Sequence, residues 1–372
     1  MASSSKHPTR NQPYENRSNL NDTNPLTAYL FRLMVIKRSN LCVSADVTTT
    51  NQLLELAEEV GDSIVLLKTH ADIISDFAER TIRGLRDIAA RKHFIVFEDR
   101  KFGDIGSTVQ KQYVGGPLSI VRWAPIVNAH IFPGPAIITA LKEAAEHALS
   151  GYNAAVSTEI SADELEAHNY PHDSPIASAS SSSSSDPHSA NTGYPGAATS
   201  SSTASASTAA PARPTPNRVP SENVGESVSS AIERLGSPPL GRALLLLAQM
   251  SSEGNLLTGE YTQRCAQMAR GHREFVMGFI AQESLNREPA DNFITLTPGV
   301  SLVGKGDGLG QQYNGPDKVI KDAGSDVIIV GRGILIAEDR AEEAEKYRAA
   351  GWRAYEERVG LRKVGGRLRD GS

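Results

Sequence analysis

The chain has 372 residues, enough for one large domain or two, and its hydrophobic fraction of 39% is ordinary for a globular protein. A net charge of −5 and a pI near 6.0 give no strongly basic field, so nucleic acid is not implied as a partner. No apolar run approaches the length of a membrane span, and Cys42 and Cys265 form no C-x-x-C motif. These features predict a cytoplasmic protein without a membrane partner.

The N-terminal residues 1–22 are polar and lack the apolar core of a signal peptide, so we expect them to form a disordered tail. The residues that follow have helical spacing and predict a helix that closes the bottom of the fold. Its apolar face would carry Leu26, Tyr29, Leu30, Leu33 and Met34. We interpret residues 23–360 as one catalytic domain and residues 361–372 as a C-terminal tail.

Eight short apolar runs follow in chain order, and segments with helical spacing separate them. The runs occupy residues 41–47, 64–69, 94–97, 126–131, 243–250, 276–281, 293–296 and 327–330. Strands that alternate with helices imply a parallel sheet with right-handed crossovers. Eight such units in about 250 residues predict an α/β fold, a (β/α)8 TIM barrel. A doubly wound open sheet is the alternative, although no G-x-G-x-x-G follows the first strand.

Residues 150–239 form a long insertion between the fourth and fifth predicted strands, and they are rich in Ser, Ala, Thr and Pro. Because residues 174–221 have almost nothing to bury, we expect this middle part to be disordered, with short helices near residues 158–168 and 227–235. A barrel tolerates such an insertion since loop-closure entropy grows slowly with length. A passive spacer is our interpretation; a phosphorylation target and a partner-binding segment are the alternatives.

The predicted strands end in polar or turn-forming residues, and in TIM barrels these ends form the active site. In chain order they are Asp46; Lys68 and His70; Asp99, Lys101 and Asp104; Asn128 and His130; Ser251; Gln282; Pro298 with Gly299; and Arg332. One polar strand end would mean little. Their recurrence at each strand favours a site at the mouth of the barrel.

The third predicted strand runs into five charges, in the segment FEDRKFGDIG. Alternation along a strand places Asp99 and Lys101 on one face and Arg100 on the other, while Asp104 lies beyond Gly103. An ammonium beside a carboxylate suits the movement of a proton onto or off carbon. A salt-bridged strand end is the alternative interpretation, and we assign Glu98 and Arg100 a structural role.

The last two strand-end loops resemble a phosphate site. The first is the glycine-rich segment TPGVSLVGKGDGLGQQY, and the second, VGRGI, carries Arg332 between Gly331 and Gly333. A guanidinium can bind two phosphate oxygens while neighbouring amides donate further hydrogen bonds, and these two loops are the usual phosphate position in this fold. Turn glycines with a surface arginine are the alternative. His168 and His172 have i,i+4 spacing but lie in the low-complexity insertion, so we expect no metal site.

The segments LCVSADV, LLKTH, FEDRKFGDIGSTV, AQMSSEG, TGEY, GFIAQ, TPGV, GDGLGQQY and IIVGRG, in this order, resemble the orotidine 5'-phosphate decarboxylases of the fungal type. The resemblance covers about residues 26–352, except the insertion. It implies decarboxylation of orotidine 5'-monophosphate to uridine 5'-monophosphate, the last step of de novo UMP synthesis, without a cofactor or metal. It also implies a homodimer with shared active sites.

The resemblance further implies a role for each matched residue. Lys101 would protonate C6 of the pyrimidine, Asp99 would lie against the substrate carboxylate, and Lys68 would complete the charge row. Asp104 and Thr108 would reach into the partner's site, and residues 298–313 would form a lid. The substrate-binding set would comprise Asp46, Lys68, His70, Thr108, Ser251, Pro298, Gln311, Tyr313, Gly331 and Arg332.

Two other functions are compatible with the residues alone. One is a related barrel enzyme that uses a metal-stabilised enediolate of a sugar phosphate, although Lys68 and Lys101 would crowd a cation in the mouth. The other is a non-catalytic scaffold that presents the serine-rich insertion to a partner.

Overall fold

The computed structural model describes residues 7–167, 227–303 and 313–361. The chain divides into two compact units, one made of residues 1–157 and 226–372 and the other of residues 158–225. The first unit contains the eight strands. In the second, the described residues are the final turns of helix α6.

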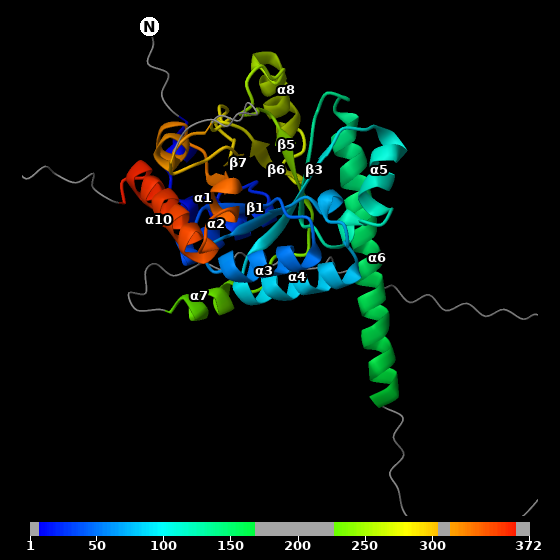
Figure 1. The fold of residues 1–372 in the computed structure, drawn as a ribbon. Coiled ribbons are helices and arrows are strands. Elements are labelled where there is room, and N and C mark those ends of the chain that lie inside the picture. The colour runs from blue at the N-terminus through cyan, green and yellow to red at the C-terminus, as the bar shows by residue number, and fades with distance from the viewer. Residues whose placement is uncertain (1–6, 168–226, 304–312, 362–372) are drawn as a thin grey trace, which may run out of the picture. The chain divides into compact units, whose positions relative to one another are not determined.

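The first unit is a closed barrel of eight parallel strands that pair in sequence order, and β8 pairs with β1 (Figure 1). The strands are β1 (Leu41–Ala45), β2 (Leu66–Thr69), β3 (Ile95–Phe102), β4 (Ile126–Ala129), β5 (Ala243–Leu247), β6 (Val276–Ile280), β7 (Ile294–Thr297) and β8 (Val327–Val330). All eight predicted runs form strands. The TIM-barrel prediction is therefore confirmed, and the open-sheet alternative is wrong.

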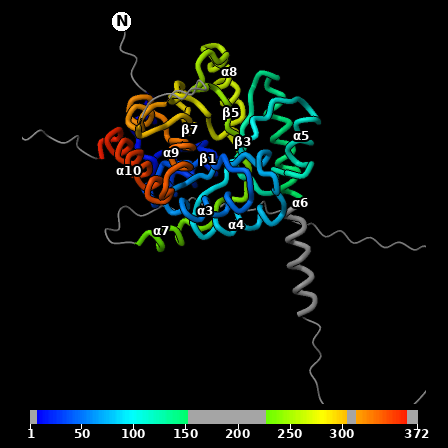
Figure 2. The backbone as a smooth tube through the Cα atoms, in the orientation of Figure 1, coloured from blue at the N-terminus to red at the C-terminus, as the bar shows by residue number. Residues whose placement is uncertain are grey.

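Helices connect the strands and surround them, and Figure 2 traces the chain from the N-terminal helices to α10. The α-helices are α1 (Tyr14–Ser18), α2 (Pro25–Lys37), α3 (Thr50–Val60), α4 (Glu79–Lys92), α5 (Gly106–Val114), α6 (Ala136–Ala167), α7 (Val228–Leu235), α8 (Gly259–Arg270), α9 (Arg332–Leu335) and α10 (Arg340–Arg358). Short 3-10 turns occur at η1 (Pro8–Arg10), η2 (Ala71–Ile73) and η3 (Ile120–Arg122), and η4 (Asp317–Asp322) is a π-helical turn.

Helix α2 follows from its sequence. The side chain of Asn24 accepts hydrogen bonds from the first free N–H groups of the helix, and Pro25 suits the first turn. The helix ends at Arg38, whose φ of 48° is left-handed. The five apolar residues predicted to share one face are all buried, as expected for a helix packed on the barrel. Both cysteines are buried as well, with free thiols.

The prediction of a disordered tail up to residue 22 is wrong for residues 7–22. Tyr14 is fully buried, and its ring stacks on Tyr355 of α10 with centroids 4.0 Å apart. Arg17 is 2% exposed and pairs with Asp326 at 2.5 Å, just before β8. These partners lie more than 300 positions away in the sequence, so local polarity gave no indication that the segment is held in place.

The insertion begins and ends in helices. Helix α6 continues from the segment after β4 to Ala167, so the short helix predicted near residues 158–168 is the end of this longer helix. Helix α7 confirms the helix predicted at residues 227–235, with the Ser227 hydroxyl accepting a hydrogen bond from the Ser230 N–H at 3.1 Å. The prediction of disorder at residues 174–221 lies outside the described residues.

Candidate active site

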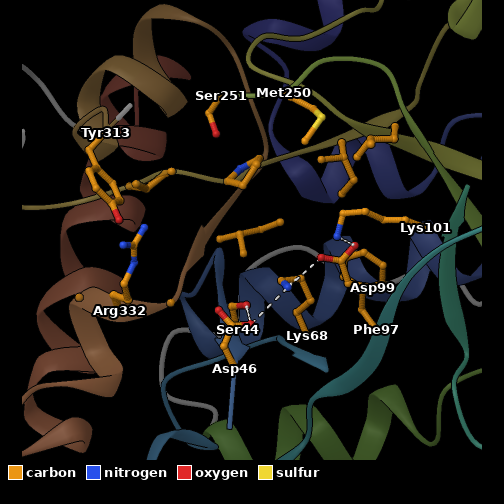
Figure 3. A pocket seen from close by; sticks show the side chains of 18 of the residues that line it. Ser44, Asp46, Lys68, Phe97, Asp99, Lys101, Met250, Ser251, Tyr313 and Arg332 are labelled. Atoms are coloured by element: carbon orange, nitrogen blue, oxygen red, sulfur yellow. Dashed lines mark hydrogen bonds and ion pairs between the residues drawn. The ribbon is translucent and has the colours of Figure 1, made fainter. Parts of the chain in front are cut away.

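A cavity opens at the carboxyl ends of the strands, where the sequence predicts the site (Figure 3). It brings together side chains from strand ends and loops that lie up to 289 positions apart in the sequence, between Ser44 and Gly333. Its lining includes nine of the predicted site residues: Asp46, Lys68, Asp99, Lys101, Ser251, Pro298, Tyr313, Gly331 and Arg332.

A row of alternating charges forms the floor of the cavity. Nζ of Lys68 lies 2.8 Å from Oδ2 of Asp99, and Nζ of Lys101 lies 2.7 Å from its Oδ1. Asp46 continues the row, with Oδ1 3.7 Å from Nζ of Lys68. Figure 3 shows Lys68 between the two aspartates, with Lys101 beyond Asp99. The prediction that Asp99 and Lys101 point together is confirmed.

The two ammonium groups keep Asp99 ionised. Burial alone would raise the pKa of this carboxyl, but the charge of Lys68, a hydrogen bond from His70 and the charge of Lys101 outweigh it. The pKa of Asp99 therefore lies well below its usual range. His70 belongs to the same cluster, because its Nε2 lies 2.7 Å from Nζ of Lys68 and 3.3 Å from Oδ2 of Asp99.

An irregularity in β3 directs Lys101 into the mouth. Glu98 pairs with Val127 and Phe102 with Ala129, so three residues of β3 stand opposite Asn128 alone. Such a bulge increases local twist and redirects side chains. Lys101 has a φ of 51°, in the left-handed region that costs a non-glycine residue about 1 kcal/mol or more. Regular alternation did not predict this conformation.

Asn128 stabilises the bulge from β4. Its side-chain oxygen Oδ1 accepts a hydrogen bond from the Lys101 backbone N–H at 2.7 Å. Its side-chain Nδ2 donates a hydrogen bond to Oδ1 of Asp99 at 2.6 Å. Asn128 is fully buried. The sequence indicated it only as one of the polar strand ends, without a role.

The opposite side of the cavity has the character of an anion site. The guanidinium of Arg332 lies 5.7 Å from the centroid of the Tyr313 ring, and Gly331 and Gly333 flank it in the chain. Gly299 has a φ of 76°, which glycine adopts without strain, and the chain that follows pairs back through Val300 and Asn314. Residues 304–312 of the predicted lid lie outside the described residues. They include Gln311, a predicted phosphate ligand.

Asp104 and Thr108 do not line this cavity. Oδ2 of Asp104 accepts a hydrogen bond from the Gln112 side chain at 3.1 Å, and Thr108 is exposed on α5. Two large apolar side chains in this region are also exposed: Ile105 at 60%, which follows Asp104 in the chain, and Phe132 at 67%, whose ring lies against Gly103.

Some lining residues were absent from the predicted set. Ser44 donates a hydrogen bond to Oδ1 of Asp46 at 2.8 Å, and its position two residues earlier on β1 could have indicated that it shares the inward face. Gln249 and Met250 line the cavity just before Ser251. They lie within the predicted fifth run, which the apolar pattern assigns to the strand rather than to the site.

Comparison with known proteins places the chain among enzymes. The sequence profile of the orotidine 5'-phosphate decarboxylase / HUMPS family matches residues 39–347. The orotidine 5'-phosphate decarboxylase of Aureobasidium pullulans is 48% identical over 352 residues, which cover 95% of this chain and 96% of that protein. The enzyme of the same name from Hypocrea atroviridis is 45% identical over 375 residues and is 99% covered. The uridine 5'-monophosphate synthase of Bos taurus is 37% identical over 345 residues, which span 52% of it.

Proposed function

Because the chain belongs to the orotidine 5'-phosphate decarboxylase family, we propose that the barrel mouth binds orotidine 5'-monophosphate and that the charge row acts on its carboxylate. The protein is a carboxy-lyase that converts this nucleotide to uridine 5'-monophosphate and carbon dioxide, in pyrimidine biosynthesis. The observation that carries the assignment of roles is the ionised Asp99 held between the Lys68 and Lys101 ammonium groups.

Lys101 is the proton donor in this proposal. The bond between C6 and the carboxyl carbon breaks, its electron pair stays on C6, and carbon dioxide leaves. The ammonium of Lys101 stabilises that developing negative charge and then transfers a proton to C6, after which the amine regains a proton from solvent. The carbanion orbital lies in the ring plane, so the π system offers no electron sink. A preorganised cation is the stabiliser that the cavity supplies.

In this proposal the remaining site residues bind the substrate. Asp46, Lys68 and His70 hold the ribose hydroxyls, because they lie together at the ends of β1 and β2. Ser251 binds the pyrimidine edge from the loop after β5. The phosphate occupies the side formed by Pro298, Gln311, Tyr313, Gly331 and Arg332. Its binding energy, remote from the reacting carbon, aligns the charges.

This assignment fits the lysines better than the metal-dependent alternative does. Both oxygens of Asp99 already accept ion pairs from ammonium groups, and a divalent cation at this position would face the repulsion of Lys68 and Lys101. The direct test follows orotidine monophosphate absorbance with purified protein that has been stripped of metal. Steady loss of substrate supports the assignment, and activity that needs an added divalent ion contradicts it.

We also infer that the enzyme is a cytoplasmic homodimer in which Asp104 and Thr108 complete the partner's site. Ile105, which follows Asp104, and Phe132, whose ring lies against Gly103, are both exposed outside this chain's cavity and support such an interface. No described helix is both long and apolar enough to cross a membrane. Mixing Lys101→Ala and Asp104→Ala chains tests the sharing: each alone is inactive, and mixed dimers regain one intact site. A mixture without activity contradicts a shared site.

A further inference from the structure

Tyr347 lies on α10 behind the phosphate side of the cavity and contacts both segments that form this side. The residue is 1% exposed, and its hydroxyl accepts the backbone N–H of Leu302 at 3.2 Å. A Cβ placed on Gly333 would overlap the same hydroxyl and would lie 3.1 Å from Cζ of the ring. The Gly333 backbone therefore packs directly against the phenol.

Each of these two contacts is made with a segment that is close to a proposed phosphate-binding residue. Leu302 belongs to the segment after β7. In this segment the Ser301 N–H donates a hydrogen bond to the backbone oxygen of Asn314 at 3.1 Å, and Asn314 follows Tyr313 in the chain. Gly333 follows Arg332 in the turn after β8. One buried side chain thus touches the two segments that present Tyr313 and Arg332.

We propose that Tyr347 is a positioning residue that holds these two segments in register for the substrate phosphate. The inference rests on the proposed function, which makes phosphate the ligand of Tyr313 and Arg332. The hydroxyl is needed for the role because a phenylalanine ring would fill the same space without reaching the Leu302 N–H. The bond is only partly buried, so its loss is expected to cost about 1 kcal/mol of stability, which leaves the variant folded.

The test measures the affinity of Tyr347→Phe for uridine 5'-monophosphate and for uridine, which lacks the phosphate. We expect the nucleotide to bind about three- to ten-fold more weakly, the range of a single hydrogen bond, while uridine binds as it does to the unmodified protein. Tyr355→Phe is the matched control, because the Tyr355 hydroxyl on the same helix accepts the Tyr14 N–H at 2.9 Å instead. This control should weaken neither ligand selectively.

Equal weakening of both ligands, or no weakening of the nucleotide, would overturn the proposal. A second variant tests the contact itself. Gly333→Ala should cost less phosphate affinity when combined with Tyr347→Phe than alone, since the hydroxyl it would strike is gone. Additive losses would contradict a shared contact. Turnover of orotidine monophosphate by the unmodified protein is measured in parallel, so a failure of the decarboxylase assignment is separated from a failure at Tyr347.

Discussion

The side-chain Nδ2 of Asn128 donates a hydrogen bond of 2.6 Å to Oδ1 of Asp99, while the side-chain oxygen of Asn128 accepts the Lys101 backbone N–H. A single buried side chain of β4 thereby orients the carboxylate of Asp99 and the backbone that carries Lys101. The charge row depends on a neighbouring strand as well as on β3.

Replacement of this side chain should impair chemistry more than substrate binding. In Asn128→Ala the Lys101 N–H loses its partner, so we expect a loss of about 1–3 kcal/mol in the free energy of unfolding and a fall in kcat of roughly ten- to a hundred-fold. The matched control is Asn286→Ala, which removes a buried amide that bonds the Phe293 backbone. It should cost similar stability with kcat unchanged, and equal kcat losses in both variants would refute the positioning role.

Arg332 should act mainly on binding. A lysine cannot reproduce the paired N–H groups of a guanidinium, so Arg332→Lys is expected to raise KM by roughly ten-fold or more with a smaller change in kcat. Steady-state kinetics with orotidine monophosphate measure both quantities. Arg353→Lys, on the outer surface of α10, serves as the control. An unchanged KM in Arg332→Lys would remove this residue from the phosphate site.

Glu98 should make stability depend on pH. Burial raises the pKa of this carboxyl to about 7, against the hydrogen bonds from Thr69 and Ala71. The folded state therefore holds the proton more tightly than the unfolded state does. The resulting stabilisation is complete below the unfolded pKa of about 4.5 and is lost as pH rises through about 7, by up to about 3 kcal/mol.

Glu98→Gln tests this dependence because an amide does not ionise. Urea unfolding at pH 5 and pH 7.5 should show a smaller pH difference for the variant than for the unmodified protein. Asp291→Asn is the control: its pKa is lowered to about 2, so its contribution is the same at both pH values. If the unmodified protein and Glu98→Gln respond equally to pH, Glu98 does not titrate in this range.

Deletion of residues 174–221 separates an enzyme from a scaffold. The cavity residues that the structure describes all lie outside this range, so kcat and KM should stay within about two-fold of the full chain. A large loss of turnover would show that the insertion takes part in catalysis. The deletion is compared with the full chain at equal protein concentration, because the proposed shared site would make activity depend on dimer formation.

The sequence predicted those features that local patterns encode. Apolar runs at regular intervals gave all eight strands, and the polar residues after them marked the mouth of the barrel. Features that depend on distant partners were not predicted. Arg17 looks like part of a polar tail until Asp326 folds against it, and the left-handed φ of Lys101 depends on Asn128 from the next strand.

The most direct test of the account is the turnover of Lys101→Ala, measured as the loss of orotidine monophosphate absorbance, together with its affinity for uridine 5'-monophosphate. In the proposed mechanism the Lys101 ammonium both stabilises the carbanion and protonates C6, so we expect no detectable decarboxylation by Lys101→Ala while the product still binds. Normal turnover by Lys101→Ala would contradict the account.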